Sequence, residues 1–238
     1  MINTILFDLD GTILPLDMDA FTKIYFKEIS SFFREPEGNK LVSNIWTATN
    51  AMLHNTEDKT NEEVFMKTFE TLIPEGELES YKKRFDEFYD NGFLKTKAAA
   101  SQNKLIKKSI YILKSKNYKL ALATNPLFPA KAIHHRIRWA GLEPEDFFYI
   151  TTYENNHFCK PQLQYYEEIL RDINKTPEEC LMVGNDVQED LVASKIGIMT
   201  FLIRNHLIHR TNEKIISDYM GNYEDFYHFA ESLPDILV

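Results

Sequence analysis

The stretch Phe7-Asp8-Leu9-Asp10-Gly11-Thr12 closes a short apolar run, residues 5–7, and the fold can be worked out from it. The run has no helical period and stops at a carboxylate, which predicts a buried parallel strand. Ligands of an open parallel sheet bind just beyond the carboxyl ends of its strands, so Asp8 stands where chemistry is expected. Residues two apart on a strand share a face, so Asp8 and Asp10 are expected to point the same way. Gly11 lets the backbone turn directly after them.

Asp8 and Asp10 are close enough to repel each other unless a cation or a shared proton relieves the repulsion. A hard divalent cation held by oxygen ligands is the obvious remedy, and Mg²⁺ is the cation expected. The alternative is that both residues only form the turn after the strand, because Asp and Gly are common in turns. The six residues alone leave both interpretations open, and the remainder of the chain decides between them.

The chain has 238 residues, of which 44% are hydrophobic and 26% charged, and its net charge is −9. This composition is typical of a globular protein. The negative charge argues against binding to nucleic acid or to an anionic membrane, although a metal ion and a lysine can still attract a phosphate locally. Two cysteines, Cys159 and Cys180, form neither a disulfide framework nor a zinc motif, which fits a reducing cytoplasm. No apolar run approaches the roughly 20 residues of a membrane span, and the start of the chain has no basic-then-apolar leader.

Residues 15–94 are predicted to form a small helical unit inserted after the first strand. Apolar side chains recur there at helical spacing, and Thr60 and Glu63 have the spacing of a capping box. The predicted helices span residues 17–34, 40–53, 61 to a break at Pro74, and 78–89, and the first is expected to end at Glu35-Pro36-Glu37-Gly38. The Phe and Tyr stripes of these helices are interpreted as the core of the bundle before they are considered as a substrate pocket.

From about residue 98, short apolar runs alternate with amphipathic helices. Strands are predicted at residues 3–9, 119–124, 147–150, 180–183 and 198–203. Helices are predicted at residues 102–115, 129–140, 162–173, 187–196 and, in the tail, 223–233. This alternation implies right-handed crossovers and a parallel sheet covered on both sides. We therefore predict a doubly wound, Rossmann-like α/β core of residues 1–14 and 95–238, with the helical unit 15–94 as a second domain.

Further polar residues follow the other predicted strands. Thr124 ends one strand, Lys160 opens the helix after the next, and the acidic stretch 184–190 follows a third. Because the carboxyl ends of parallel strands lie at one edge of the sheet, these residues are expected to meet the first two carboxylates. One hydroxyl, one ammonium and four carboxylates are what metal-assisted phosphoryl transfer needs. The expected set is Asp8, Asp10, Thr124, Lys160, Asp186 and Asp190.

The chain resembles the haloacid dehalogenase-like superfamily, whose members are mostly magnesium-dependent phosphatases and phosphotransferases. Four motifs carry the resemblance, in the family's order: the D-x-D-G-T at 8–12, the strand-end Thr124, the lysine of the pair Lys160-Pro161, and the acidic stretch 184–190. The resemblance covers nearly the whole core. It implies that residues 15–94 are the helical cap of that superfamily, because only 35 residues separate Thr124 from Lys160 and leave no room for the alternative cap position.

The resemblance implies a chemical role for each motif. Asp8 is expected to attack the substrate phosphorus and form an aspartyl-phosphate. Asp10 is expected to protonate the leaving oxygen and then to deprotonate the attacking water. Thr124, Asn125 and Lys160 are expected to hold the phosphoryl oxygens, with Lys160 neutralising charge on both the nucleophile and the phosphate.

The resemblance also implies a magnesium site. Mg²⁺ is expected to be held by Asp8, the backbone carbonyl of Asp10 and Asp186, while Asp190 holds metal-bound water or orients the motif lysine. The family pattern usually has Asp directly after the glycine of the fourth motif, whereas Asn185 stands there in this chain. Asp186 keeps the D-x-x-x-D spacing to Asp190, so it is predicted as the ligand, with Asn185 as the alternative.

Two other groups of residues are predicted to have no chemical role. His134, His135, Arg136 and Arg138 are interpreted as a basic patch on the solvated face of a helix. Cys159 is expected to be inert, although the neighbouring lysine would lower the pKa of its thiol.

We therefore expect a magnesium-dependent phosphatase that hydrolyses a small phosphorylated metabolite through an aspartyl-phosphate. Asp10 favours phosphate chemistry over dehalogenation, because a leaving halide needs no proton. A phosphomutase of the same superfamily is an alternative, as is a non-catalytic protein that binds a phosphorylated ligand and regulates through it. The pair of Asp8 and Asp10 argues against the binding protein, since a binder does not need the second acid.

Overall fold

The described chain folds around one sheet of six parallel strands in the order β3-β2-β1-β4-β5-β6. The structure is a computed structural model, and it describes residues 1–33 and 38–237. The strands are β1 (Thr4–Phe7), β2 (Lys119–Leu122), β3 (Tyr149–Ile150), β4 (Cys180–Gly184), β5 (Met199–Ile203) and β6 (Tyr219–Gly221). β1 lies between β2 and β4, so its carboxyl end adjoins those of both neighbours.

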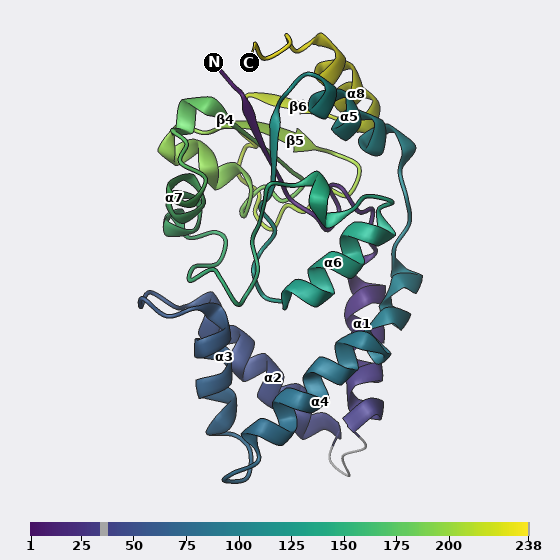
Figure 1. Cartoon of the computed structure of the whole chain (residues 1–238), viewed down its shortest axis with the longest axis vertical. Coiled ribbons are helices and arrows are strands. Elements are labelled where there is room, and N and C mark those ends of the chain that lie inside the picture. Colours follow the sequence, from purple (N-terminus) through teal and green to yellow (C-terminus); the bar gives the residue numbers. More distant parts are fainter. Residues whose placement is uncertain (34–37, 238) are drawn as a thin grey trace.

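Helices cover both faces of this sheet (Figure 1). They are α5 (Lys104–Ser115), α6 (Ala130–Trp139), α7 (Leu163–Asp172), α8 (Tyr223–Ser232) and the 3-10 helix η4 (Leu191–Ile196). Ile5 and Phe7 of β1 pack in one core with α5, α6 and α8, whereas Leu6 packs in a second core with α7 and η4. This alternation follows from the two-residue period of a strand. The doubly wound α/β class predicted from the sequence is confirmed.

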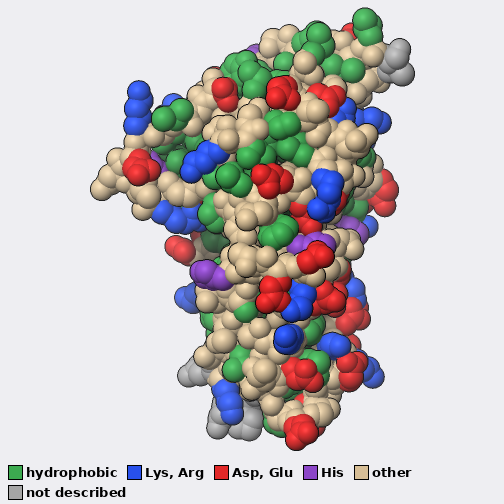
Figure 2. Space-filling view, turned by 90° about the vertical axis from the view of Figure 1, so that its left-hand side faces the viewer, with side chains coloured by type: hydrophobic (Ala, Val, Ile, Leu, Met, Phe, Trp, Pro, Cys, Tyr) green, Lys and Arg blue, Asp and Glu red, His purple; other side chains and the backbone are tan. Residues whose placement is uncertain are grey.

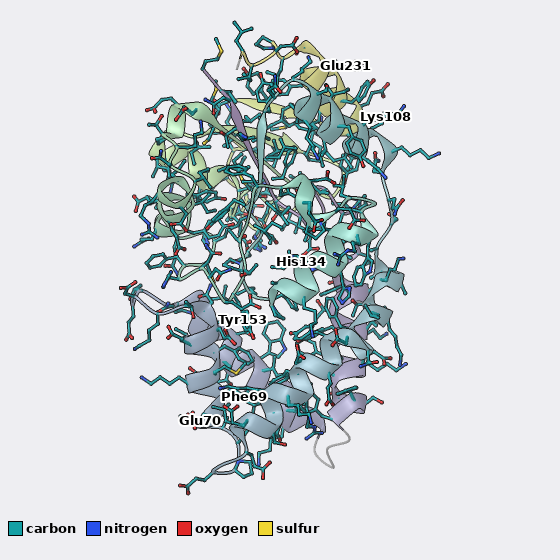
Figure 3. The ribbon with its side chains drawn as sticks, viewed as in Figure 1. Phe69, Glu70, Lys108, His134, Tyr153 and Glu231 are labelled. Carbon is teal, nitrogen blue, oxygen red and sulfur yellow. The ribbon has the colours of Figure 1, made fainter. Side chains whose placement is uncertain are left out.

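Four helices of the described chain lie together beyond the carboxyl ends of the strands, and we call them the cap helices (Figure 1). They are α1 (Met18–Phe33), α2 (Gly38–Leu53), α3 (Asn61–Glu70) and α4 (Leu78–Asp90). Their aromatic side chains share a core, in which the ring of buried Phe69 contacts those of Tyr81 and Phe85. Figure 3 labels Phe69 among the cap helices. The predicted capping box of Thr60 and Glu63 is present at the start of α3. The helical insertion is confirmed, while its limits at residues 15 and 94 stay a prediction.

Two segments connect the cap helices to the sheet, and they run side by side. The N–H of Asp17 donates to the carbonyl oxygen of Ala99 (3.0 Å), and the N–H of Ser101 donates to that of Pro15 (2.9 Å). Ala99 ends η1 (Gly92–Ala99), a 3-10 helix after α4 that the sequence does not predict. These paired backbone bonds fix where the cap helices leave the core.

The start of α3 is also hydrogen bonded to the core. The N–H groups of Asn61 and Glu62 donate to the carbonyl oxygens of Asn156 (2.9 Å) and Tyr153 (2.8 Å). Figure 3 shows Tyr153 where the cap helices face the core. Two N–H groups that the first turn of a helix leaves unpaired are satisfied in this way. The cap helices are thus held over the strand ends from two sides.

Parts of the fold differ from the sequence-based expectation. The α-helix predicted at residues 187–196 is wrong, because residues 187–190 form turns and only η4 is helical, with 3-10 geometry. The carboxylate of Asp186 accepts the N–H groups of Gln188 and Glu189 (both 3.0 Å), as the side chain of an N-cap residue does, and the chain continues in turns to η4. The sequence also does not predict β6. Residues 35–37, where the first helix is expected to end, lie outside the described residues.

Acidic and basic side chains are interspersed over the face shown in Figure 2. The net charge of −9 is therefore not gathered into a single patch on this face. Within residues 1–33 and 38–237, no helix has the length and apolar character needed to cross a membrane.

We expect Gly11→Ala to lower the free energy of unfolding by about 2 kcal/mol or more. Gly11 has φ = +85°, and a Cβ atom there would lie 2.4 Å from Nδ2 of the buried Asn185. The left-handed backbone costs an alanine roughly 1 kcal/mol, and overlap with a packed side chain adds roughly 1–3 kcal/mol. Urea unfolding of the wild type and the variant measures the difference.

Gly76→Ala is the matched control for this substitution. Gly76 has φ = +83°, but among the described residues no atom beyond its own chain neighbours lies within 4 Å of a Cβ atom built there. Gly76→Ala should therefore lose only the free energy that the left-handed backbone costs. Equal decreases in the free energy of unfolding for the two variants would contradict the close approach of Gly11 to Asn185.

Candidate active site

Residues that follow β1, β2 and β4 line one cavity of about 500 Å³ between the sheet and the cap helices. The predicted site residues among them are Asp8, Asp10, Thr124, Asn125, Asn185, Asp186 and Asp190. Lys160 lies beside the cavity and contacts Asp8. The fold thus brings the predicted site residues together at one edge of the sheet.

The backbone places Asp8 directly after the last residue of β1. Its N–H still donates to the carbonyl oxygen of Val183 in β4 (2.9 Å), which holds the residue at the strand end. The chain then turns, and the N–H of Leu14 donates to the carbonyl oxygen of Leu9 (2.8 Å). Asp10 stands in this turn and lines the same cavity as Asp8. The turn, rather than a shared strand face, brings the two acids to one side.

Lys160 joins two of the predicted carboxylates. Its Nζ donates to Oδ1 of Asp8 (2.9 Å) and to Oδ1 of Asp190 (2.7 Å). The side chains of Lys160 and Asp190 are each 1% exposed. Oδ2 of Asp190 accepts the N–H of Asp186 (2.8 Å). Gly184 leaves room for this carboxylate, since a Cβ atom there would lie 2.1 Å from Oδ2. Asp190 is therefore placed to orient the lysine.

Burial and neighbouring charges shift the pKa values of these groups. Burial raises the pKa of Asp8 to about 7, although Lys160 opposes the shift and Asp190 adds to it. Burial also raises the pKa of Asp10, against the attraction of Arg136 and Lys160. Burial alone would lower the pKa of Lys160, but Asp190 and Asp8 hold it well above its usual value. The two acids are thus costly to ionise together unless further positive charge is added.

Arg136 is a member of the site that the sequence analysis misplaces. The solvated face predicted for it is wrong, because its side chain is 1% exposed and its Nη1 is ion paired with Oδ2 of Asp10. Its guanidinium also lies 4.6 Å from the ring centre of Phe128, within reach of a cation–π interaction. The sequence does contain a signal for the burial of Arg136. It lies three positions after the buried Ile133 and therefore on the same apolar face of the helix.

The other members of the predicted patch differ in exposure. Arg138 is exposed, whereas His134 and His135 are half-buried. Burial, together with the charge of Arg138, lowers the pKa of both imidazoles. Cys159 is buried, and burial raises the pKa of its thiol to about 12, so the thiol stays protonated and unreactive.

Two atoms at the ion pair of Asp10 and Arg136 have no hydrogen-bond partner among the described residues. They are Oδ1 of Asp10 and Nη2 of Arg136, and both are buried. Both residues line the cavity. A buried polar atom without a partner is costly, so a hydrogen bond from a ligand or a water would stabilise this acceptor and this donor.

Asn185 is held by the protein at both ends of its amide group. Its Oδ1 accepts the hydroxyl of Thr12 (2.8 Å), and its Nδ2 donates to the carbonyl oxygen of His206 (2.6 Å). Asp186 is instead paired with Arg210, whose Nη1 lies 2.7 Å from Oδ2 and whose side chain is 50% exposed. An exposed side chain such as Arg210 is displaced more easily than the buried Thr12 and the main-chain carbonyl of His206, so Asp186 is the less firmly held of the two residues.

Thr124 and Asn125 form the wall of the cavity beside β2. The carbonyl oxygen of Thr124 accepts the hydroxyls of Thr151 (2.6 Å) and Tyr165 (2.8 Å). Oδ1 of Asn125 accepts the N–H of Lys160 (3.2 Å). These bonds fix the loop after β2 against the lysine that contacts the first carboxylate.

The chemistry of the donors suits a hard divalent cation such as Mg²⁺. Five carboxylates and three cationic side chains lie at the cavity, which leaves an excess of two negative charges when all are ionised. These are Asp8, Asp10, Asp186, Glu189 and Asp190, with Arg136, Lys160 and Arg210. In the described residues, however, no three His, Cys, Asp or Glu side chains are already grouped to hold a metal ion. Arg210 must leave Asp186 before that carboxylate can bind one.

The family model of the haloacid dehalogenase-like hydrolases matches residues 2–196. The chain belongs to this family. The resemblance to this family is thereby confirmed.

Several known proteins are similar to this haloacid dehalogenase-like hydrolase. Glyceraldehyde 3-phosphate phosphatase of Methanothermobacter thermautotrophicus is 32% identical over 97 residues, which are 40% of this chain and 41% of that protein. The match therefore spans less than half of the relative.

Solved structures of the family share the fold. The putative HAD-hydrolase YfnB from Bacillus subtilis, bound to magnesium, has a TM-score of 0.60 and 20% identity over 97% of this chain and 99% of that one. A HAD phosphatase from Thermococcus onnurineus has a TM-score of 0.59 and 16% identity over 99% of this chain and 100% of that one. Such coverage includes the cap helices as well as the sheet.

We expect Asp190→Asn to lower the free energy of unfolding by about 2 kcal/mol or more, because it removes one of the two carboxylates that pair with the buried Lys160. Glu79→Gln is the control, since Glu79 pairs with Lys82 on the surface, where the side chains are 82% and 40% exposed. Such a pair is worth roughly 0–1 kcal/mol. Chemical unfolding measures both changes, and a loss no larger for Asp190→Asn than for Glu79→Gln would contradict the buried pairing.

Proposed function

We propose that this haloacid dehalogenase-like hydrolase is a magnesium-dependent phosphatase of a small phosphorylated metabolite. The observation that carries the proposal is a pair of acids at one cavity. Asp8 accepts a hydrogen bond from the buried ammonium of Lys160. Asp10 lines the same cavity, and its Oδ1 has no hydrogen-bond partner among the described residues. The similar protein from Methanothermobacter thermautotrophicus is named a phosphatase, which supports the same class of reaction.

In the first step, a carboxylate oxygen of Asp8 forms a bond to the phosphorus, and the bond between phosphorus and the leaving oxygen breaks. Asp10 gives its proton to that oxygen, so a neutral alcohol leaves. Thr124, Asn125 and Lys160 hold the phosphoryl oxygens, and Lys160 balances the charge on the nucleophile and the phosphate. The product of this step is an aspartyl-phosphate at Asp8.

In the second step, water attacks the phosphorus, the bond to Asp8 breaks, and inorganic phosphate leaves. Asp10, ionised by the first step, takes a proton from the water and returns to its starting form. Arg136 pairs with Oδ2 of Asp10, which leaves Oδ1, the oxygen without a partner among the described residues, to exchange the proton in both steps. One acid thus serves both half-reactions, and Arg136 is its positioning residue.

Mg²⁺ would be held by the carboxylate of Asp8, the backbone carbonyl of Asp10 and the carboxylate of Asp186, with Asn185 as the alternative to Asp186. When bound, the ion supplies positive charge that offsets the charge of the phosphoryl oxygens. Arg210 would give up Asp186, and because its side chain is 50% exposed it can turn into water.

Two alternatives differ from the phosphatase in the fate of the phosphoryl group after the first step. A phosphomutase needs an aspartyl-phosphate that outlives the exchange of the leaving alcohol for a second acceptor. A protein that only binds a phosphorylated ligand forms no aspartyl-phosphate and has no use for the acid and base Asp10. A cytoplasmic location, which the free and buried Cys159 and Cys180 support, belongs to the same proposal.

We expect Asp8→Asn to lower kcat/KM for p-nitrophenyl phosphate by about 10⁴-fold or more, because an amide cannot form the acyl phosphate. The assay is run with Mg²⁺ and with a chelator. Asp19→Asn is the control, since Asp19 is an exposed acid on α1 and should leave the rate unchanged. Activity of Asp8→Asn would contradict the assignment of Asp8 as the nucleophile. Activity of the wild type in the chelator would contradict the requirement for a metal ion.

We expect Asp186→Ala to weaken the binding of Mg²⁺ by about tenfold or more, and Asn185→Ala to weaken it less. Loss of the Asn185 amide breaks its bonds to Thr12 and His206 and so lowers stability rather than metal affinity. Calorimetric titration of Mg²⁺ into the metal-free proteins compares the two variants. The opposite order of affinities would assign the metal to Asn185.

A further inference from the structure

The cavity extends from the strand ends into the cap helices, and its character changes along the way. Among the described residues that line it, every charged side chain belongs to the core. Of the same described residues, those that the cap helices contribute are all uncharged. We call this uncharged part the cap chamber. Its wall includes Phe21, Phe26, Trp46, Phe65, Met66 and Phe85.

Few polar groups line the cap chamber. The hydroxyls of Tyr25 and Tyr89 hydrogen bond each other (3.3 Å). Among the described residues, Thr22 and Thr49 are the other hydroxyl-bearing side chains that the cap helices contribute. A sugar placed here would bury several hydroxyls against aromatic rings, and a buried hydroxyl without a partner is costly. The chamber is therefore a poor environment for a polyhydroxylated group.

The positions of the acids determine which part of a substrate enters the chamber. The leaving oxygen departs on the side of the phosphorus opposite to Asp8, and Asp10 must reach it. The guanidinium that holds Asp10 lies 4.6 Å from the ring centre of Phe128 and 6.0 Å from that of Phe21. A leaving oxygen within reach of Asp10 would thus have its neighbouring carbon atoms close to these rings, with the cap chamber beyond them.

The size of the cavity also exceeds what a small polar leaving group needs. About 500 Å³ lies within the range of cavities that enclose drug-sized ligands. Trp46 is 51% exposed and its ring packs 5.3 Å from that of Phe26, so an aromatic surface continues from the chamber to the solvent. An extended hydrocarbon can lie along this surface.

We propose that the preferred substrate is a phosphate monoester of a bulky apolar alcohol, whose hydrocarbon part fills the cap chamber. The inference rests on the proposed phosphatase function and narrows its substrate class. Burial of apolar surface supplies binding energy that a polyhydroxylated group of the same size cannot use. This substrate class differs from glyceraldehyde 3-phosphate, which the similar protein from Methanothermobacter thermautotrophicus is named for. The match covers only 41% of that protein.

The test compares hexyl phosphate with glucose 6-phosphate. Both are esters of a primary alcohol with the same number of carbon atoms, so they differ in the polarity of the leaving group and hardly in its chemistry. We expect kcat/KM in the presence of Mg²⁺ to be at least about tenfold higher for hexyl phosphate than for glucose 6-phosphate or glyceraldehyde 3-phosphate.

Met66→Gln probes the chamber with a polar side chain of similar shape. We expect it to lower kcat/KM for hexyl phosphate at least about threefold, chiefly through KM, because binding of the leaving group is what it weakens. Lys67→Gln is the matched control, since Lys67 is the next residue of α3 and is exposed. It should leave both constants unchanged.

The outcomes separate this inference from the proposed function. A preference for glucose 6-phosphate or glyceraldehyde 3-phosphate overturns the inference and leaves the phosphatase intact. If no ester is hydrolysed, the phosphatase proposal fails, and titration of 2-naphthol into the wild-type protein in a chelator then decides whether the cap chamber binds an apolar group. Saturable binding that Met66→Gln weakens and Lys67→Gln does not supports the apolar chamber, and no saturable binding overturns it.

Discussion

The buried ammonium of Lys160 is the constraint on which the rest of the site depends. A lysine that is 1% exposed is stable only when carboxylates pair with it. Asp8 and Asp190 meet this requirement from the ends of two neighbouring strands, β1 and β4. The same contacts draw the turn before η4 against the sheet and fix Asp8 at the floor of the cavity.

The sequence predicts those parts of the site that follow from strand ends. Asp8, Thr124 and Asp186 each come directly or shortly after a strand, and a parallel sheet brings such residues to one edge. The helical insertion is predictable for a similar reason, because periodicity and the capping box at Thr60 are local signals. A lysine before a helix is a weak signal by itself, so Lys160 is predicted from its place after a strand together with the other motifs, and its role from the family resemblance.

The parts that the sequence does not predict depend on tertiary contacts. Helical spacing puts Arg136 on the apolar face of α6, but its ion pair with Asp10 depends on the packing of α6 against the turn after β1. At residues 187–190 turns stand in place of the expected helix, and the N–H of Val187 there donates to the carbonyl oxygen of the distant Ile208 (2.9 Å). The cap chamber is hidden for the same reason, because residues such as Phe85 serve both the bundle core and the cavity wall. Only the packed helices show that one aromatic stripe has both functions.

The most direct test of this account is to identify the residue that carries the phosphoryl group. The protein is mixed with acetyl phosphate and Mg²⁺ and quenched in borohydride, which reduces an acyl phosphate to an alcohol, and the peptides are analysed by mass spectrometry. The account predicts homoserine in place of Asp8, and only when both the phosphate donor and Mg²⁺ are present. Reduction at another acid, or release of phosphate with Asp8 unmodified, would contradict it.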